Sequence, residues 1–452
     1  MKITNRSLFT YTLFASLLCI LGVTVYQVAG PAGGESLGTL FSIAQDVIAE
    51  SGGSDGADEP QVETLIINDS PASRDLQMNI QGLSEPWTGD AGMALLDVPN
   101  FKWVFGSAPT SAAMLAGFYD RTSLPNVYTG PTDAGVIPLT EPDSWPEWFD
   151  GTTWFPSNPL VASRQGTDGL TSRGTIDDYW IEMDSTQPDP FITNGWEEHS
   201  YGTAVGDYMR TSQSSYGLAD GSTYINFWPE GSPLTCSLMA SNGYPDGLLG
   251  VASFFAARGY GVTDCYTQLV DTQGAADGFT YNDFKAEIMA GHPVLIHLKY
   301  GDHAQTMLGI GFDESITNTI LVNTSFGASG VPIEWGGDWS TFTLHSVSVI
   351  HPTADVQPCY ALSLSYNGDG SNITAVPSNS PGCDAGKYHP YELINLTAHP
   401  SGGSGVAYWQ GTSSNFTRDL KKSIVMPVSA KSVSVVYQAE PTINVCVPAM
   451  TI

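Results

Sequence analysis

The sequence predicts an α+β fold, and three observations point to it. Signals that start and stop helices gather between residues 106 and 291. Runs rich in β-branched and aromatic residues follow from residue 293 to residue 350. From about residue 356 to residue 437, short strand-like segments alternate with turns. We therefore expect an N-terminal helix packed on a mostly antiparallel sheet, followed by a small C-terminal all-β module.

The first helix is expected over residues 109–119. Ser107 is a good N-cap, because its hydroxyl can accept a hydrogen bond from the first helical turn. Pro109 suits that turn, where its missing N–H is not needed. The segment 121–235 that follows is rich in Gly, Pro, Asp and Trp, so we expect long loops with short helices there.

Two further helices have clear ends. Residues 248–258 form a helical pattern that a glycine stops. Residues 280–290 begin with Thr280 and Asp283, the two members of a capping box, and end before Gly291. The strands of the sheet are expected in four apolar runs: 293–298, 306–312, 319–326 and 342–350.

The ends of the chain differ in composition from its middle. Lys2 and Arg6 precede an apolar run over residues 8–28, the layout of an export signal that is either cleaved or kept as a membrane anchor. Contact with a membrane is expected only through this segment. The expected divisions are 1–30 for the export segment, 31–95 for a flexible linker, 96–352 for the main domain, 356–440 for the β module and 441–452 for a tail.

The net charge and the cysteines indicate the partners and the cellular location to expect. The net charge is −30, from 46 acidic and 16 basic residues, so nucleic acid is not an expected partner. Export permits disulfides between the cysteines beyond residue 30. Proximity in the sequence pairs Cys236 with Cys265 and Cys359 with Cys383, which leaves Cys446 over. We expect an extracellular or cell-surface protein.

One stretch carries the strongest functional signal. Gly-Ser-Ala-Pro-Thr-Ser-Ala-Ala-Met at 106–114, closed by Gly-Phe-Tyr-Asp-Arg at 117–121, resembles the nucleophile segment of the papain-like cysteine peptidases grouped with the bacterial double-glycine leader peptidases. It is more similar still to their secreted, uncharacterised branch. Other motifs follow in the family's order: Ile-Asp-Asp-Tyr-Trp at 176–180, Gly-Asp-Tyr-Met at 206–209, Gly-His-Pro-Val at 291–294, Thr-Met-Leu-Gly at 306–309 and Trp-Gly-Gly at 335–337. The resemblance implies a papain-like domain over residues 96–352.

The chemistry of that family needs three groups. A cysteine lies at a helix N-terminus, a histidine at the start of a facing strand holds it as a thiolate, and an Asp or Asn on the next strand orients the imidazole. The equivalent positions of this chain hold Ser107, Gln305 and Thr324. The glutamine of the family's oxyanion hole has no counterpart at Phe101 or Lys102. We therefore expect an inactive pseudo-peptidase.

A serine triad is the alternative. His303 lies two residues before Gln305 and shares its face of a strand, and a small bulge in the segment 301–304 would bring it toward Ser107. Asn323 would then orient His303. Without a placed base, a serine hydroxyl at a helix N-terminus is inert, and Ser107 serves only to cap the helix.

Two other groups lie mainly in the long insertion. Six tryptophans could stack on sugars or peptides, although packing of the loops is the simpler interpretation: Trp145, Trp148, Trp154, Trp180, Trp196 and Trp228. Seven polar residues could chelate calcium, although they lack a recognisable ligand spacing and suit a solvated face better: Asp177, Asp178, Asp184, Asp189, Glu197, Glu198 and His199. We expect no cofactor. A protein or peptide is the partner that the groove of such a domain would take.

The β module carries a second resemblance. The segment 359–370, which ends in Asn-Gly-Asp-Gly, is similar to the divergent internalin-type B-repeat of bacterial surface proteins, as are Pro-Gly-Cys at 381–383 and Gly-Lys-Tyr at 386–388. Such modules act as spacers or adhesive units. We therefore expect an exported bacterial surface protein with a non-catalytic binding or structural role. The alternatives are an active serine-type hydrolase that uses Ser107 and His303, and a purely structural or adhesive component of the envelope.

Overall fold

The computed structural model of this chain describes residues 61–67, 92–101, 106–124, 127, 148–149, 154–155, 161, 204–211, 218, 221–316, 318–412 and 417–439. All of these residues belong to one compact unit, Pro60–Ile452. Some expected features lie outside the described residues and stay predictions: the export segment, the tail, the acidic group at 177–199, and Trp145, Trp180 and Trp196.

A nine-stranded sheet forms the main domain. Its order is β11-β10-β9-β8-β13-β7-β6, with β12 paired to β13 and β2 paired to β9, and every pairing is antiparallel. The four predicted apolar runs form β8, β9, β10 and β13, which confirms a mixed α+β fold with a mostly antiparallel sheet. The bounds are β2 (Gly92–Ala94), β6 (Leu234–Thr235), β7 (Gly261–Leu269), β8 (Val294–Tyr300), β9 (His303–Asp313), β10 (Thr319–Asn323), β11 (Val331–Glu334), β12 (Asp338–Trp339) and β13 (Phe342–Thr353).

The three predicted helices are all present. They are α3 (Ser107–Thr122), α7 (Gly247–Ala257) and α8 (Tyr281–Met289). α8 carries the predicted capping box, in which Thr280 and Asp283 each accept a backbone N–H from the other. Shorter helices are α5 (Val205–Tyr208), α6 (Cys236–Asn242) and the 3-10 turn η5 (Asp271–Gln273).

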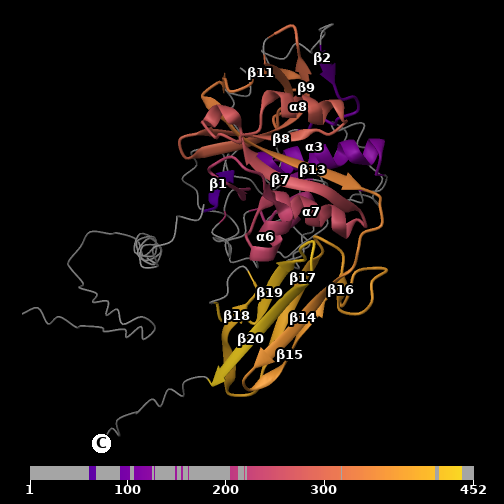
Figure 1. Ribbon diagram of the computed structural model, residues 1–452, viewed down its shortest axis with the longest axis vertical. Coiled ribbons are helices and arrows are strands. Elements are labelled where there is room, and N and C mark those ends of the chain that lie inside the picture. Colours follow the sequence, from indigo (N-terminus) through magenta and orange to yellow (C-terminus); the bar gives the residue numbers. More distant parts are fainter. Residues whose placement is uncertain are drawn as a thin grey trace, which may run out of the picture. The chain divides into compact units, whose positions relative to one another are not determined.

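The two faces of the sheet pack into separate cores. The first core holds α3 and α7 and contains the fully buried Met114, Phe254 and Leu308. The second core holds α8 and contains the fully buried Phe284 and Met307. α3 and α8 therefore lie on opposite sides of β8 and β9 (Figure 1).

The range expected to be a flexible linker, 31–95, contributes two strands. β1 (Glu63–Ile67) pairs with β5 (Thr223–Phe227), and β2 pairs with β9. Leu65 and Ile67 are buried in the first core while Ile66 between them is exposed, so the burial alternates as in a half-buried strand. Burial of these apolar side chains is what fixes this part of the range to the domain.

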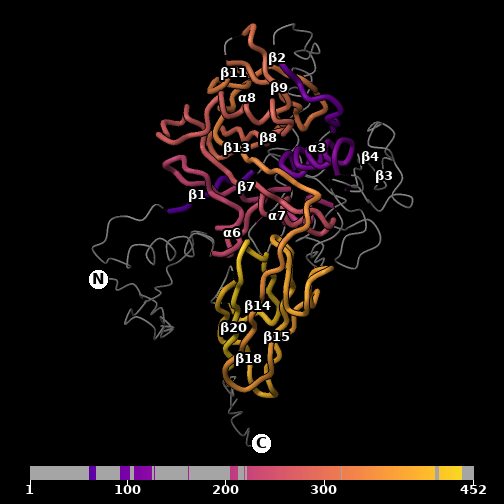
Figure 2. Tube along the Cα trace, turned by 45° about the vertical axis from the view of Figure 1, so that its right-hand side comes forward, coloured from indigo at the N-terminus to yellow at the C-terminus, as the bar shows by residue number. Residues whose placement is uncertain are grey.

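The C-terminal strands form two sheets of their own. One has the order β16-β14-β20-β18, in which β14 and β20 are parallel, and the other has the order β15-β17-β19. Figure 2 shows β14, β20 and β18 running side by side at the end of the chain, and a third core surrounds the fully buried Trp409. The bounds are β14 (Tyr360–Asn367), β15 (Gly370–Val376), β16 (Lys387–Tyr388), β17 (Leu393–Pro400), β18 (Ser404–Gln410), β19 (Lys421–Val425) and β20 (Lys431–Ala439).

This module contacts the main domain through both apolar and polar groups. Tyr391 and Val425 belong to the first core. Lys431 Nζ donates hydrogen bonds to the carbonyl oxygens of Ala240 and Ser241, at 2.9 and 3.0 Å, in α6. Burial lowers the pKa of Lys431, and the two carbonyls satisfy its ammonium group.

Two disulfides join the pairs that the sequence predicts, Cys236–Cys265 and Cys359–Cys383. Their presence indicates an oxidising environment such as the outside of a cell. Among the described residues, no helix is long and apolar enough to span a membrane.

Three of the expected tryptophans lie in the described part. Trp148 and Trp154 lie in the paired strands β3 (Trp148–Phe149) and β4 (Trp154–Phe155). Trp228 is half-buried against the first core, so it packs the domain.

Candidate functional site

The N-terminus of α3 is built around a glycine. The structure places Gly106 at the N-cap and Ser107 in the first helical turn, which corrects the prediction that Ser107 caps the helix. Gly106 has a φ of 92°, and a Cβ there would lie 2.2 Å from the carbonyl oxygen of Gly221. Only glycine meets both conditions, so the capping position was closed to serine.

Ser107 and Ser111 fasten α3 to the edge of β9. Ser107 Oγ accepts a hydrogen bond from the backbone N–H of Thr306 at 2.9 Å, and Ser111 Oγ donates one to the carbonyl oxygen of Thr306 at 2.9 Å. The two serines are one helical turn apart, so their side chains share a face of the helix. Both are fully buried. The hydroxyl of Ser107 therefore accepts a hydrogen bond from the backbone.

The end of β10 explains why the backbone of Thr306 forms hydrogen bonds with a helix. β10 pairs with β9 only as far as Asn323, which lies opposite Leu308. Thr306 is two residues beyond that end, so β10 supplies no partner for it. The side chains of α3 take the place of the missing strand, and the buried N–H and C=O of Thr306 are satisfied.

Gln305, which the sequence resemblance aligns with the histidine of the papain-like peptidases, faces away from α3. Its neighbour across the strands is Leu298, and Leu298 and Met307 both belong to the second core. Ala304 belongs to the first core, as alternation of side chains along a strand requires. Gln305 is 2 % exposed, and its Nε2 has no hydrogen-bond partner. A buried amide of this kind accepts no proton near neutral pH.

His303 lies at the far end of the β8–β9 hairpin. The register runs without a shift from Val294↔Gly309 to Tyr300↔His303, so the expected bulge at 301–304 is not formed. His303 is three residues from Thr306, about 10 Å along the strand. No hydrogen bond joins His303 to Ser107 in the part of the chain that the structure describes. The structure does not bring these two residues together.

Asn323 and Thr324 are committed to the loop that follows β10. Asn323 Nδ2 donates to the carbonyl oxygen of Pro99 at 3.2 Å, and its Oδ1 accepts from Ser329 Oγ at 2.7 Å. Thr324 Oγ1 accepts from the N–H of Ala328 at 3.1 Å. Because Asn323 lies opposite Leu308, it is five residues from the level of His303, about 17 Å along the strand. The residue proposed to orient His303 therefore does not reach it.

A buried polar ladder that the sequence did not reveal begins at Thr306. His297 Nδ1 lies 2.9 Å from Thr306 Oγ1, and its Nε2 lies 2.8 Å from Ser348 Oγ, which lies 2.7 Å from Thr267 Oγ1. All four residues are fully buried. Burial, helped by the charge of His345, lowers the pKa of His297 to about 3. In the sequence, this ladder is marked only by His297, a single histidine inside an apolar run. The other members of the ladder lie on three other strands.

A second group of titratable side chains lies toward the C-terminal end of α3. Tyr119 OH is 2.9 Å from Nδ1 of His292, whose ring stacks on that of His351 at 3.8 Å. His351 bonds to Glu287 at 2.7 Å and to Asp264 at 3.2 Å. Burial by itself lowers the pKa of His351, but these two carboxylates raise it above its ordinary value.

This group cannot act on Ser107. Tyr119 is twelve residues along α3 from Ser107, which corresponds to about 18 Å of helix. The group is a separate cluster in which two stacked imidazoles contact a tyrosine hydroxyl and two carboxylates.

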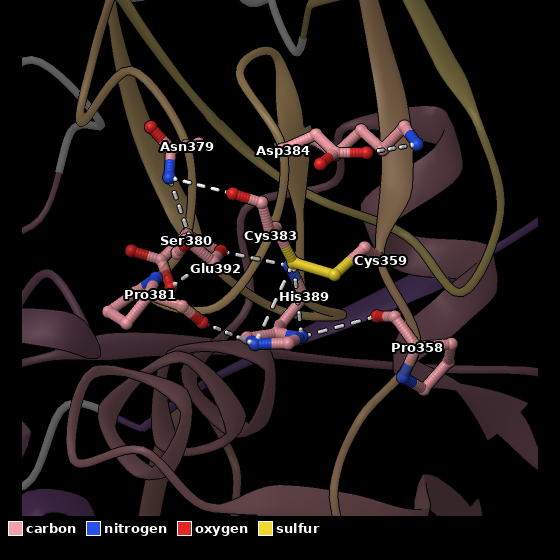
Figure 3. Close-up of a disulfide and its surroundings, with 10 residues drawn as sticks. Pro358, Cys359, Asn379, Ser380, Pro381, Cys383, Asp384, His389 and Glu392 are labelled. Atoms are coloured by element: carbon pink, nitrogen blue, oxygen red, sulfur yellow. Dashed lines mark hydrogen bonds and ion pairs between the residues drawn. A yellow bond between two sulfur atoms is a disulfide. The ribbon is translucent and has the colours of Figure 1, made fainter.

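The residue types that ligate metals meet in the C-terminal module. Cys359, Cys383 and His389 bring two sulfurs and a ring nitrogen within 4.8 Å of one another (Figure 3). Both sulfurs are joined in a disulfide, so neither is a thiolate ligand in this state. The acidic residues considered for calcium lie outside the described part of the chain.

Comparison with known proteins adds no relative. No protein-family model, no curated protein and no solved structure matches this chain. What the site can do must therefore be argued from its own geometry.

Proposed function

We propose that this chain is an exported surface protein whose papain-like domain has lost hydrolytic activity and serves a structural role, with a B-repeat-like module attached. One observation carries the proposal. The hydroxyl oxygen of Ser107 accepts the backbone N–H of Thr306 inside a fully buried contact. The Ser107 side chain is 0 % exposed in this conformation, which disfavours attack on a substrate.

The surroundings of Ser107 support the same conclusion. A serine nucleophile needs a base about 2.6–3.2 Å from its hydroxyl. Gln305 carries an amide and faces the second core. His303 lies about 10 Å along β9 from Thr306, the residue that Ser107 contacts. His297 is linked to Ser107 through Thr306, but both of its ring nitrogens already have hydroxyl partners. With its pKa lowered to about 3, it is a poor proton acceptor at neutral pH.

The joint between the main domain and the C-terminal module supports a structural role. Tyr391 and Val425 of the module are buried in the first core. Lys431 adds two hydrogen bonds to carbonyl oxygens of α6. A module that served only as a spacer would not need to share a core with the main domain. We therefore assign the main domain and the module a joint structural or adhesive role on the cell surface.

A fluorophosphonate probe tests the loss of hydrolytic activity. The full chain is incubated with the probe at neutral pH beside an active serine hydrolase, and labelled peptides are mapped by mass spectrometry. The proposal expects no label on Ser107. The matched variants are Ser107→Ala and Ser111→Ala, because both remove a hydroxyl from the same helical face. Labelling that Ser107→Ala abolishes and Ser111→Ala leaves intact would overturn the proposal and favour the serine hydrolase.

A further inference from the structure

The disulfide of the C-terminal module has an unusual neighbour. His389 lies against it, with Nδ1 3.6 Å and Nε2 3.8 Å from Sγ of Cys383 (Figure 3). Because the two distances are nearly equal, the sulfur lies over the ring and not at the end of either N–H bond. Cys359 is exposed, whereas Cys383 and His389 are half-buried. The two sulfurs of one disulfide thus have different surroundings.

Two backbone carbonyls hold this ring in place. Nδ1 of His389 lies 3.2 Å from the carbonyl oxygen of Pro358, and Nε2 lies 3.0 Å from the carbonyl oxygen of Pro381. Because a carbonyl oxygen only accepts hydrogen bonds, a ring nitrogen that bonds to one of them does so as an N–H donor. The carbonyls therefore orient the ring against Sγ of Cys383.

We propose that Cys359–Cys383 is a thiol-exchange site for small-molecule thiols. The external thiolate attacks Sγ of the exposed Cys359, and a new sulfur–sulfur bond forms there. The bond to Cys383 breaks, and its electron pair goes to Cys383, which leaves as a thiolate beside the ring of His389. The sulfur of the external thiol is oxidised to the disulfide level, and the sulfur of Cys383 is reduced.

The chemistry of exchange favours this direction of attack. A leaving thiol departs faster when its thiolate is stabilised, and a nearby cation stabilises a thiolate. Access favours the same sulfur, because the attacking thiol must approach along the line of the sulfur–sulfur bond from the exposed side. Cys359 is thus the sulfur attacked, and Cys383 is the one released.

The same chain contains an inert reference. Cys236 is 0 % exposed and Cys265 is 6 % exposed. Neither belongs to the cluster that Cys359, Cys383 and His389 form. The Cys236–Cys265 disulfide should therefore resist the same thiol under native conditions. This contrast makes the inference independent of Ser107 and of the proposed loss of hydrolysis.

The test uses the folded full chain and glutathione as the probe. After brief exposure, free thiols are trapped with N-ethylmaleimide and the peptides are mapped by mass spectrometry. The proposal expects glutathione on Cys359, N-ethylmaleimide on Cys383, and an intact Cys236–Cys265 bond. Glutathione mainly on Cys383, or equal reaction at both disulfides, would overturn it.

Variants of the histidine separate charge from packing. His389→Gln should slow exchange at least about tenfold and divide the adduct between the two cysteines, because the leaving thiolate loses the imidazole beside it. His389→Lys places a positive charge at this position and should recover much of the rate and the preference for Cys359. His399→Gln is the control, since His399 bonds to Thr374 in the same module, and exchange should not change. Equal or faster exchange in His389→Gln would contradict the proposal.

Discussion

Acid should destabilise this protein through His297. The ordinary pKa of histidine is 6.5, and burial lowers that of His297 to about 3. Between pH 6.5 and about pH 3, His297 is therefore protonated in the unfolded chain and neutral in the folded chain. The stability from neutral His297 is present above pH 6.5 and is lost as the pH falls toward 3. At pH 4.5, which is two pH units below the ordinary pKa, the free energy of unfolding is lower by about 2.7 kcal/mol.

The assay is urea unfolding at pH 7.5 and pH 4.5, followed by tryptophan fluorescence with the disulfides intact. His297→Gln removes the titrating group and keeps an amide that can donate and accept. The difference in unfolding free energy between the two pH values should shrink by about 2.7 kcal/mol in this variant.

His351→Gln is the control of opposite sign. The pKa of His351 is raised, so its contribution is present at low pH and is lost as the pH rises. Removing it should enlarge the loss of stability at pH 4.5. The reasoning fails if His297→Gln has the same pH dependence as the wild type.

Three other substitutions test the packing. Gly106→Ala should lower the free energy of unfolding by more than about 2 kcal/mol, because its φ is 92° and the new Cβ would meet the carbonyl of Gly221 at 2.2 Å; a neutral result in urea unfolding would refute this. Gln305→Met keeps the volume and removes an unsatisfied buried N–H, so stability should stay equal or rise by about 1–3 kcal/mol; a clear loss would reveal a partner for that amide. Lys431→Met should cost about 1–3 kcal/mol and hasten proteolysis between the main domain and the β module, and unchanged cleavage would show that its two hydrogen bonds do not hold the joint.

Local signals in the sequence were enough for the regular elements. The capping box of Thr280 and Asp283 and the glycine after each helix act within a few residues, so α7 and α8 could be predicted with their ends. The apolar runs of β8, β9, β10 and β13 were also visible without their partners. The disulfide pairings followed from separations of 29 and 24 residues.

What the sequence did not reveal depends on distant contacts. β1 and β2 are only five and three residues long, and their pairing with β5 and β9 identifies them as strands. The cap of α3 went to Gly106 because the carbonyl of Gly221, more than a hundred residues away, leaves no room for a side chain. Such a close approach has no local signature.

The candidate site was limited in the same way. A sequence motif gives the order of residues along the chain, but the register of β9 decides which face of the sheet each residue occupies. Gln305 and His303 fall on the face of the second core, and Thr306 on the face of α3. The ladder through His297 joins four strands, so it could be found only once their pairing was known.

The central claim is that Ser107 is a structural hydrogen-bond acceptor and not a nucleophile. The free energy of unfolding of Ser107→Ala tests this most directly. Loss of the hydroxyl leaves the buried N–H of Thr306 without its partner, so we predict a decrease of about 1–3 kcal/mol. A serine kept for chemistry is commonly replaced at no cost in stability. Equal or greater stability of Ser107→Ala would contradict the account.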